Sequence, residues 1–83
     1  MSSREDSVSA GVPCFDVVLA APDGTVRPSE VRAVIQRHRG RLARLVHFGQ
    51  QRANLRVVTS RVYDIVVALE ATGLEVVRVV ATP

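Results

Sequence analysis

The residue type in this sequence that is most concentrated in one place is arginine. Nine of the eleven basic residues lie between Arg27 and Arg61, and Glu30 is the only acid among them. This segment carries a charge of +8, whereas the whole chain carries +3. Guanidinium groups bind phosphate, so these arginines are candidates for contact with nucleic acid. The candidate positions are Arg37, Arg39, Arg41, Arg44, Arg52 and Arg56. In the plainer interpretation, the arginines form a solvated rim and some of them only complement the carbonyl end of a helix.

Residues that could support catalysis or bind a metal are few and scattered. Cys14 is the only cysteine, and His38 and His47 fall inside predicted elements at a spacing that matches no metal motif. The acids form no pair, and no Ser-His-Asp arrangement can be argued from the sequence. We therefore expect no enzyme activity, no metal site and no cofactor.

Length and composition predict one small globular domain. We expect a disordered N-terminal tail over residues 1–12 and a single domain over residues 13–83. Apolar residues make up 47% of the chain, but no apolar run approaches the roughly 18 residues of a membrane span. A single cysteine fits a reducing compartment, so we expect a cytoplasmic protein with no membrane partner. Because so small a domain buries a modest core, a homodimer or higher homo-oligomer is expected.

The first half of the domain is predicted to form a strand, a turn and a helix. "CFDVVLAA" alternates apolar and polar residues from Cys14, and "PDG" at 22–24 then favours a turn. Pro28 suits the first turn of a helix, and Gly40 stands where a left-handed C-terminal cap is expected. The apolar stripe of this helix consists of Val31, Val34, Ile35 and His38.

The second half repeats this order around one additional strand. Strands are predicted over 41–48, 54–59 and 74–81. Between the last two lies a helix with Ser60 as its predicted N-cap and Gly73 as its C-cap. The apolar stripe of this second helix is Val62, Ile65, Val66 and Leu69, and Tyr63 beside it is expected in the core or at an interface.

The order βαββαβ predicts an α+β protein with a ferredoxin-like sandwich. Right-handed crossovers give a four-stranded antiparallel sheet, order 4-1-3-2, with two helices on one face. The expected core is Phe15, Val17, Leu19, Val31, Val34, Ile35, Leu55, Val57, Val62, Ile65, Val66 and Leu69. The uncovered face is expected to carry Asp16, Val18, Arg56 and Val58, with Arg44 and Arg78 joining them in one register. A mixed apolar and arginine face suggests a partner, most simply a second copy of the chain.

Three segments of the chain resemble a small regulatory ACT domain, as found after paired CBS modules in bacterial proteins. They are "VRAVIQRHRGRLARLVHFG", "LRVVTS" and "DIVVALEATGLEVVRVV". The resemblance implies a non-catalytic module that binds an amino acid or similar small ligand at a dimer interface. It further implies that the turn after the first strand lines the ligand site with its backbone, which here means Pro22, Asp23 and Gly24. Because "APDGTVRPSE" is longer than the usual turn of that family, a module with an assembly role alone stays open.

Nucleic-acid binding by the arginine-rich segment is the alternative. The RNA-binding version of this fold reads bases with aromatic residues on its central strands. The predicted third strand, "NLRVVT", has none, and the chain holds only Phe15, Phe48 and Tyr63 as aromatic residues. The sequence therefore favours the small-ligand module over nucleic-acid contact.

Overall fold

The computed structural model of this chain describes residues 12–82. The elements are strand β1 (Cys14–Ala20), helix α2 (Pro28–Arg37), strand β2 (Arg41–His47), strand β3 (Arg52–Val58), helix α3 (Val62–Ala71) and strand β4 (Glu75–Ala81). Each predicted element is present, with ends within two residues of the prediction. The tail predicted over 1–12 lies outside the described residues except for Val12.

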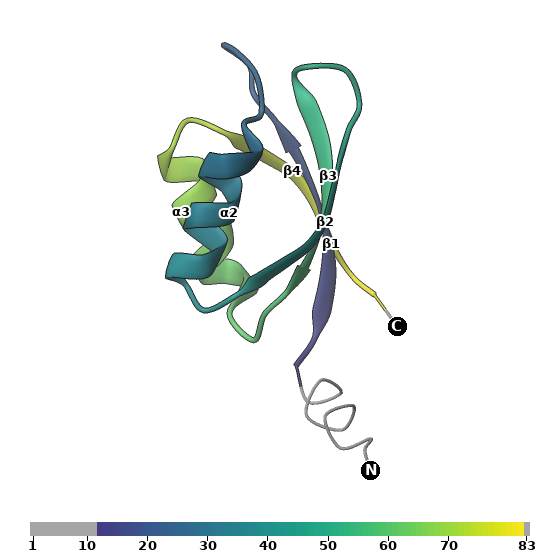
Figure 1. The fold of residues 1–83 in the computed structure, drawn as a ribbon, viewed down its shortest axis with the longest axis vertical. Helices are drawn as coiled ribbons and strands as arrows, with labels where there is room; N and C mark the ends of the chain where they lie inside the picture. The colour runs from purple at the N-terminus through teal and green to yellow at the C-terminus, as the bar shows by residue number, and fades with distance from the viewer. Residues whose placement is uncertain (1–11, 83) are drawn as a thin grey trace.

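The four strands form one antiparallel sheet in the order β2-β3-β1-β4. Read from the other edge, this is the predicted order 4-1-3-2. Both helices cover the same face of the sheet, and the opposite face is bare (Figure 1). The predicted α+β, ferredoxin-like βαββαβ architecture is therefore confirmed. We call the bare side the open face.

The core lies between the helices and the sheet, where the alternation of each inner strand places its apolar residues. Ten of the twelve predicted core residues are buried, while Phe15 and Val66 are half-buried. Ala21, Val26 and Ala53 are buried as well. The sheet is thus sealed on the helical side by aliphatic side chains, mostly valine, isoleucine and leucine.

Val26 gives a structural reason for the long connection between β1 and α2. Its side chain is fully buried, and its amide donates to the Gln50 carbonyl at 3.1 Å. Its own carbonyl lies 3.1 Å from Nε2 of His47, and the amide of Ala21 donates to the carbonyl of Gln51 at 2.7 Å. These bonds tie the β1–α2 connection to the β2–β3 connection. His47 therefore has a structural role.

The end of α2 differs from the prediction. Gly40 does not occupy the left-handed position, because Arg39 does, with φ of 63°. The Arg39 amide donates to the carbonyl of Gln36 and the Gly40 amide to that of Ile35, which is the Schellman pattern of a helix end. Gly40 is needed for space instead, since a Cβ there would lie 2.8 Å from Cδ1 of Ile65.

Helix α3 corrects the predicted N-cap and excludes one of the two positions expected for Tyr63. Its N-cap is Arg61, not Ser60, and the hydroxyl of buried Thr59 accepts a hydrogen bond from the Arg61 amide at 2.9 Å. Tyr63 is not in the core, because 81% of its side chain is exposed. Gly73 follows the helix with φ of 98°, so the predicted glycine cap is confirmed.

Candidate functional site

The strand register arranges the open face into four rows that cross the sheet. One row is Arg41, Val58 and Cys14, and the next is Arg44, Arg56, Asp16 and Val80. The third row is Val46, Asn54, Val18 and Arg78, and the fourth is Phe48, Arg52, Ala20 and Glu75. The predicted set of Asp16, Val18, Arg56 and Val58 is confirmed, and the register adds Arg44 and Arg78. Apolar and basic side chains are therefore mixed over the whole face.

Positive charge dominates this face. Five arginines and two acids lie in the four rows. Arg44 and Arg56 are direct cross-strand partners, a placement that is unfavourable for like charges. Nε of Arg56 donates to Oδ1 of Asp16 at 3.2 Å, and this bond raises the pKa of Arg56 above its ordinary value. Within residues 12–82, no carboxylate lies within ion-pair distance of Arg44.

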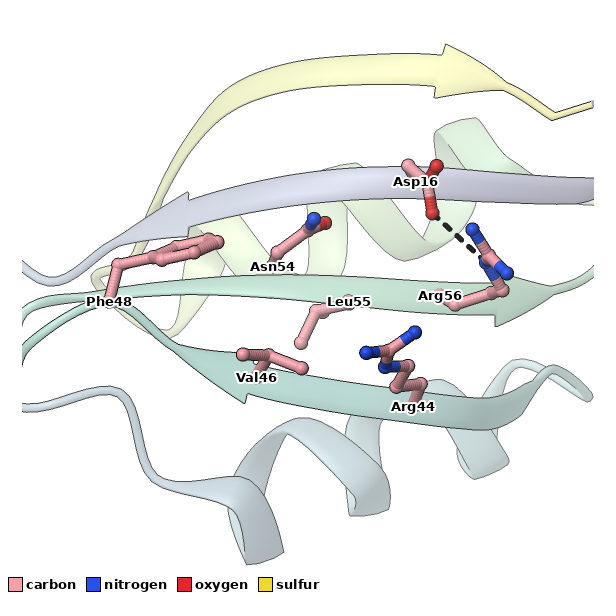
Figure 2. Close-up of a pocket in the computed structure, with 7 residues that line it drawn as sticks. All are labelled: Asp16, Arg44, Val46, Phe48, Asn54, Leu55 and Arg56. Carbon is pink, nitrogen blue, oxygen red and sulfur yellow. Dashed lines mark hydrogen bonds and ion pairs between the residues drawn. The ribbon is translucent and has the colours of Figure 1, made fainter.

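A hollow of about 250 Å³ lies in the middle of the open face. Figure 2 shows Arg44, Arg56 and Asp16 at one end and Phe48 at the other, with Val46 and Asn54 between them. The two arginines come from adjacent strands, and Phe48 follows directly after β2. The hollow therefore has a basic end and an aromatic end.

Asn54 lies in this hollow with an unfulfilled hydrogen-bonding group. Its Oδ1 atom is buried, and it has no partner among the described residues. Buried polar atoms in proteins are nearly always paired, and an unpaired one costs free energy. An N–H or O–H donor that reaches this atom, from water or from a ligand, would supply the missing partner.

The turn at Pro22, Asp23 and Gly24 lies at the end of the sheet where Phe48 is, and none of the three residues lines this hollow. All three residues are exposed, and the Gly24 amide closes the turn on the Ala21 carbonyl at 3.2 Å. Asp23 and Gly24 border a separate hollow of about 320 Å³ that also touches the α3–β4 connection at Gly73 and Leu74. Pro22 instead borders a third hollow of about 590 Å³ beside the β2–β3 connection.

The structure divides the six arginines that were candidates for nucleic-acid contact. Arg41, Arg44, Arg52 and Arg56 share the open face. Arg37 belongs to the last turn of α2 and Arg39 to the connection after it, so both lie in the other layer. Part of the basic cluster is therefore helix termination.

Phe48 and Asn54 are the site residues that the sequence analysis did not single out. The alternation of β2 places Phe48 on the same face as Arg44 and Val46, so this signal was present in the sequence. The unpaired state of Asn54 depends on packing and has no sequence signal. The bulges after Leu42 in β2 and near Val77 in β4 also fix which side chains face outward, and neither was predicted.

The remaining candidates do not gather into a site. In the part of the chain that the structure describes, His, Cys, Asp and Glu side chains form no group of three that could hold a metal. Cys14 is half-buried on β1. Neither of the two ten-residue helices in the described range is long enough to cross a membrane. Comparison with protein-family models, curated proteins and solved structures finds no match for this chain.

Proposed function

We propose that this chain is a non-catalytic, ACT-like regulatory or assembly module that self-associates and takes an amino acid or similar small ligand at the Pro22–Gly24 turn. The observation that supports the assembly role is the exposure of three valines on β4, an edge strand of the sheet. Val77, Val79 and Val80 are 45%, 38% and 41% exposed there. An edge strand that exposes valines and unpaired backbone groups favours pairing with another chain.

The charge distribution favours β4 over the open face as the contact between copies. Stacking two open faces would bring two arginine-rich surfaces together, and repulsion between them opposes that arrangement. The β4 edge carries one arginine and one acid, Arg78 and Glu75. Antiparallel pairing of two β4 strands would extend the sheet and leave both open faces free.

Gly24 supports the ligand role of the turn. Its φ is not in the left-handed range, and a Cβ built on it meets no atom within 4 Å. Steric contact within one copy therefore does not require a glycine here, although glycine is common at the last position of a β-turn such as Ala21–Gly24. Close approach of a ligand or a second chain to the backbone would also explain the glycine. The hollow of about 320 Å³ beside it is within the size range of small-molecule sites.

A thermal-shift screen against the twenty amino acids tests this proposal. At about 100 times Kd, a ligand adds about 2.7 kcal/mol of stability, and the Tm of a domain of this size then rises by roughly 10–20 °C. Gly24→Val is the informative variant, because it should leave the Tm of the free protein unchanged and abolish the shift. A monomeric protein whose Tm responds to none of the amino acids would contradict the proposal.

Nucleic-acid binding is the second candidate function, and the gathering of five arginines on the open face favours it. Fluorescence anisotropy with labelled RNA and DNA at about 50 and 200 mM salt tests this candidate, because phosphate contacts weaken as salt increases. Absence of binding at the lower salt concentration would exclude it.

A further inference from the structure

We propose that the hollow between Arg44, Arg56, Asn54 and Phe48 holds one unpaired base of a single-stranded nucleic acid, while its phosphates follow the arginines of the open face. This inference rests on the second candidate function and adds the class of nucleic acid and the residues that contact a base. Its support is the coincidence in one hollow of unbalanced positive charge, an exposed aromatic ring and an unpaired buried acceptor.

The charges point to an anion with several spaced groups. Arg44 on β2 lies directly opposite Arg56 on the neighbouring strand β3, and Asp16 forms an ion pair with Arg56 only. Arg41, Arg52 and Arg78 lie in three different rows of the same face. An anion between Arg44 and Arg56 would remove their repulsion, and the other arginines would meet further phosphates along a strand.

The shape of the hollow fits one flat ring better than a whole cofactor. Its volume of about 250 Å³ is below the usual range of roughly 300–1,000 Å³ for sites that enclose a small molecule. Phe48 is 57% exposed and Val46 is 38% exposed, so both offer apolar surface to an incoming group. Aromatic side chains beside a basic surface form the platforms on which unpaired bases stack.

Asn54 completes the match. The buried Oδ1 of Asn54 has no hydrogen-bond donor among the described residues. Each of the natural nucleobases carries at least one N–H donor on its edge. Figure 2 shows the Phe48 ring directed toward Asn54, so a base stacked on the ring would have its edge near the amide. In a duplex this edge is already paired, and single strands are therefore preferred.

A binding assay with matched ligands tests the inference. Labelled RNA and DNA of about eight nucleotides, single-stranded or as duplexes, are titrated with the full chain, and inorganic polyphosphate and polyglutamate serve as competitors without bases. We expect single strands to bind more tightly than duplexes. If the four open-face arginines other than Arg56 each contact a phosphate, the rise in salt from about 50 to 200 mM should weaken single-strand binding roughly 50-fold.

Variants separate contact with the base from contact with phosphate. Phe48→Ala should weaken binding about 5- to 150-fold, the range for loss of one stacking platform. Asn54→Ala should also weaken it, although the Oδ1 atom that it removes makes no hydrogen bond to the described residues. Arg44→Gln should reduce affinity and the salt dependence, whereas Arg32→Gln on α2 removes the same charge from the other layer and should change neither. Unchanged Tm values show that each variant folds.

Each result has one meaning. If Arg44→Gln weakens binding but Phe48→Ala and Asn54→Ala do not, the base pocket is wrong and arginine-mediated binding survives. Equal displacement by polyphosphate or polyglutamate at matched charge also overturns the base pocket. If no oligonucleotide binds at the lower salt concentration, the second candidate function fails together with this inference, while the amino-acid module is unaffected.

Discussion

At the scale of single residues, Gly40 and Gly24 show two different reasons for a glycine. Gly40 lies between the helix end and the core, and a Cβ there would be 2.8 Å from Cδ1 of Ile65 and 3.0 Å from Cγ2 of Ile35. Gly24 has open space around it. The first glycine is therefore required by the fold of one copy, and the second is free to serve contacts with other molecules.

We expect Gly40→Ala to destabilise the protein by about 1–3 kcal/mol, because the added methyl group overpacks the core. Ile65→Val removes the methyl in closest contact and alone costs about 0.5–1.5 kcal/mol. The double variant should lose less free energy of unfolding than the sum of the two single variants, and urea unfolding measures this coupling. Gly24→Ala is the control, with a change within about 0.5 kcal/mol. Strict additivity of the pair would show that the contact does not limit the site.

How much of the candidate site could be predicted also depends on single residues. The alternation of the chain was enough to place Asp16 and Arg56 on one face, whereas Arg44 joined them in only one of the possible registers, and the bulge after Leu42 decides which register is adopted. Charge and alternation did not identify Phe48 as part of the hollow, because this residue follows an edge strand and aromatic contacts to bases are expected on the central strands. The Oδ1 of Asn54 becomes buried without a partner only when the neighbouring strands pack around it. No pattern in the sequence predicts that this hydrogen bond is missing.

At the scale of elements, alternation and helical periodicity were sufficient to place all six strands and helices. The ends of the helices are harder to predict from the sequence, because a cap depends on which backbone groups come within hydrogen-bonding distance. At the end of α2, a glycine one residue later than the left-handed position was mistaken for the cap, since Arg39 takes that conformation instead. At the start of α3, the acceptor for the Arg61 amide is the buried Thr59 hydroxyl rather than Ser60.

The strained end of α2 leads to a second stability prediction. A left-handed conformation costs a non-glycine residue about 1–2 kcal/mol, and a glycine avoids this cost. Glycine in turn loses about 0.5–1 kcal/mol more conformational entropy on folding, which offsets part of the gain. Arg39→Gly should therefore stabilise the protein by about 0.5–1 kcal/mol. Arg37→Gly removes the same charge within the last helical turn and should destabilise it by up to about 1 kcal/mol. Chemical denaturation compares the two, and destabilisation by Arg39→Gly would contradict the assignment.

At the scale of the whole molecule, the two layers differ in what they leave exposed. The open face combines basic and apolar groups, while α3 presents Tyr63 and Val67 to solvent, 81% and 65% exposed. The edge of β4 is the third apolar region. If the chain self-associates through one of these regions as proposed, the others stay available, so the choice of interface would decide which surface can bind a ligand.

Light scattering on single substitutions identifies that interface. If β4 pairs with β4 of a second copy, Val79→Lys should convert the dimer to a monomer, because lysines on edge strands oppose strand pairing. Val67→Lys adds the same charge to the outer side of α3 and should leave the dimer intact. The reverse pattern would place the interface on α3, and a wild-type monomer would remove the assembly role.

The position of β1 in the sheet has a consequence for synthesis. β1 is an interior strand, yet both of its neighbours, β3 and β4, come later in the chain. While translation is under way, the Cys14–Ala20 segment has no β4 beside it, and its free backbone groups can pair with a strand of another nascent chain. The topology that gives β1 two hydrogen-bonded neighbours in the finished fold therefore leaves its backbone groups unpaired during translation.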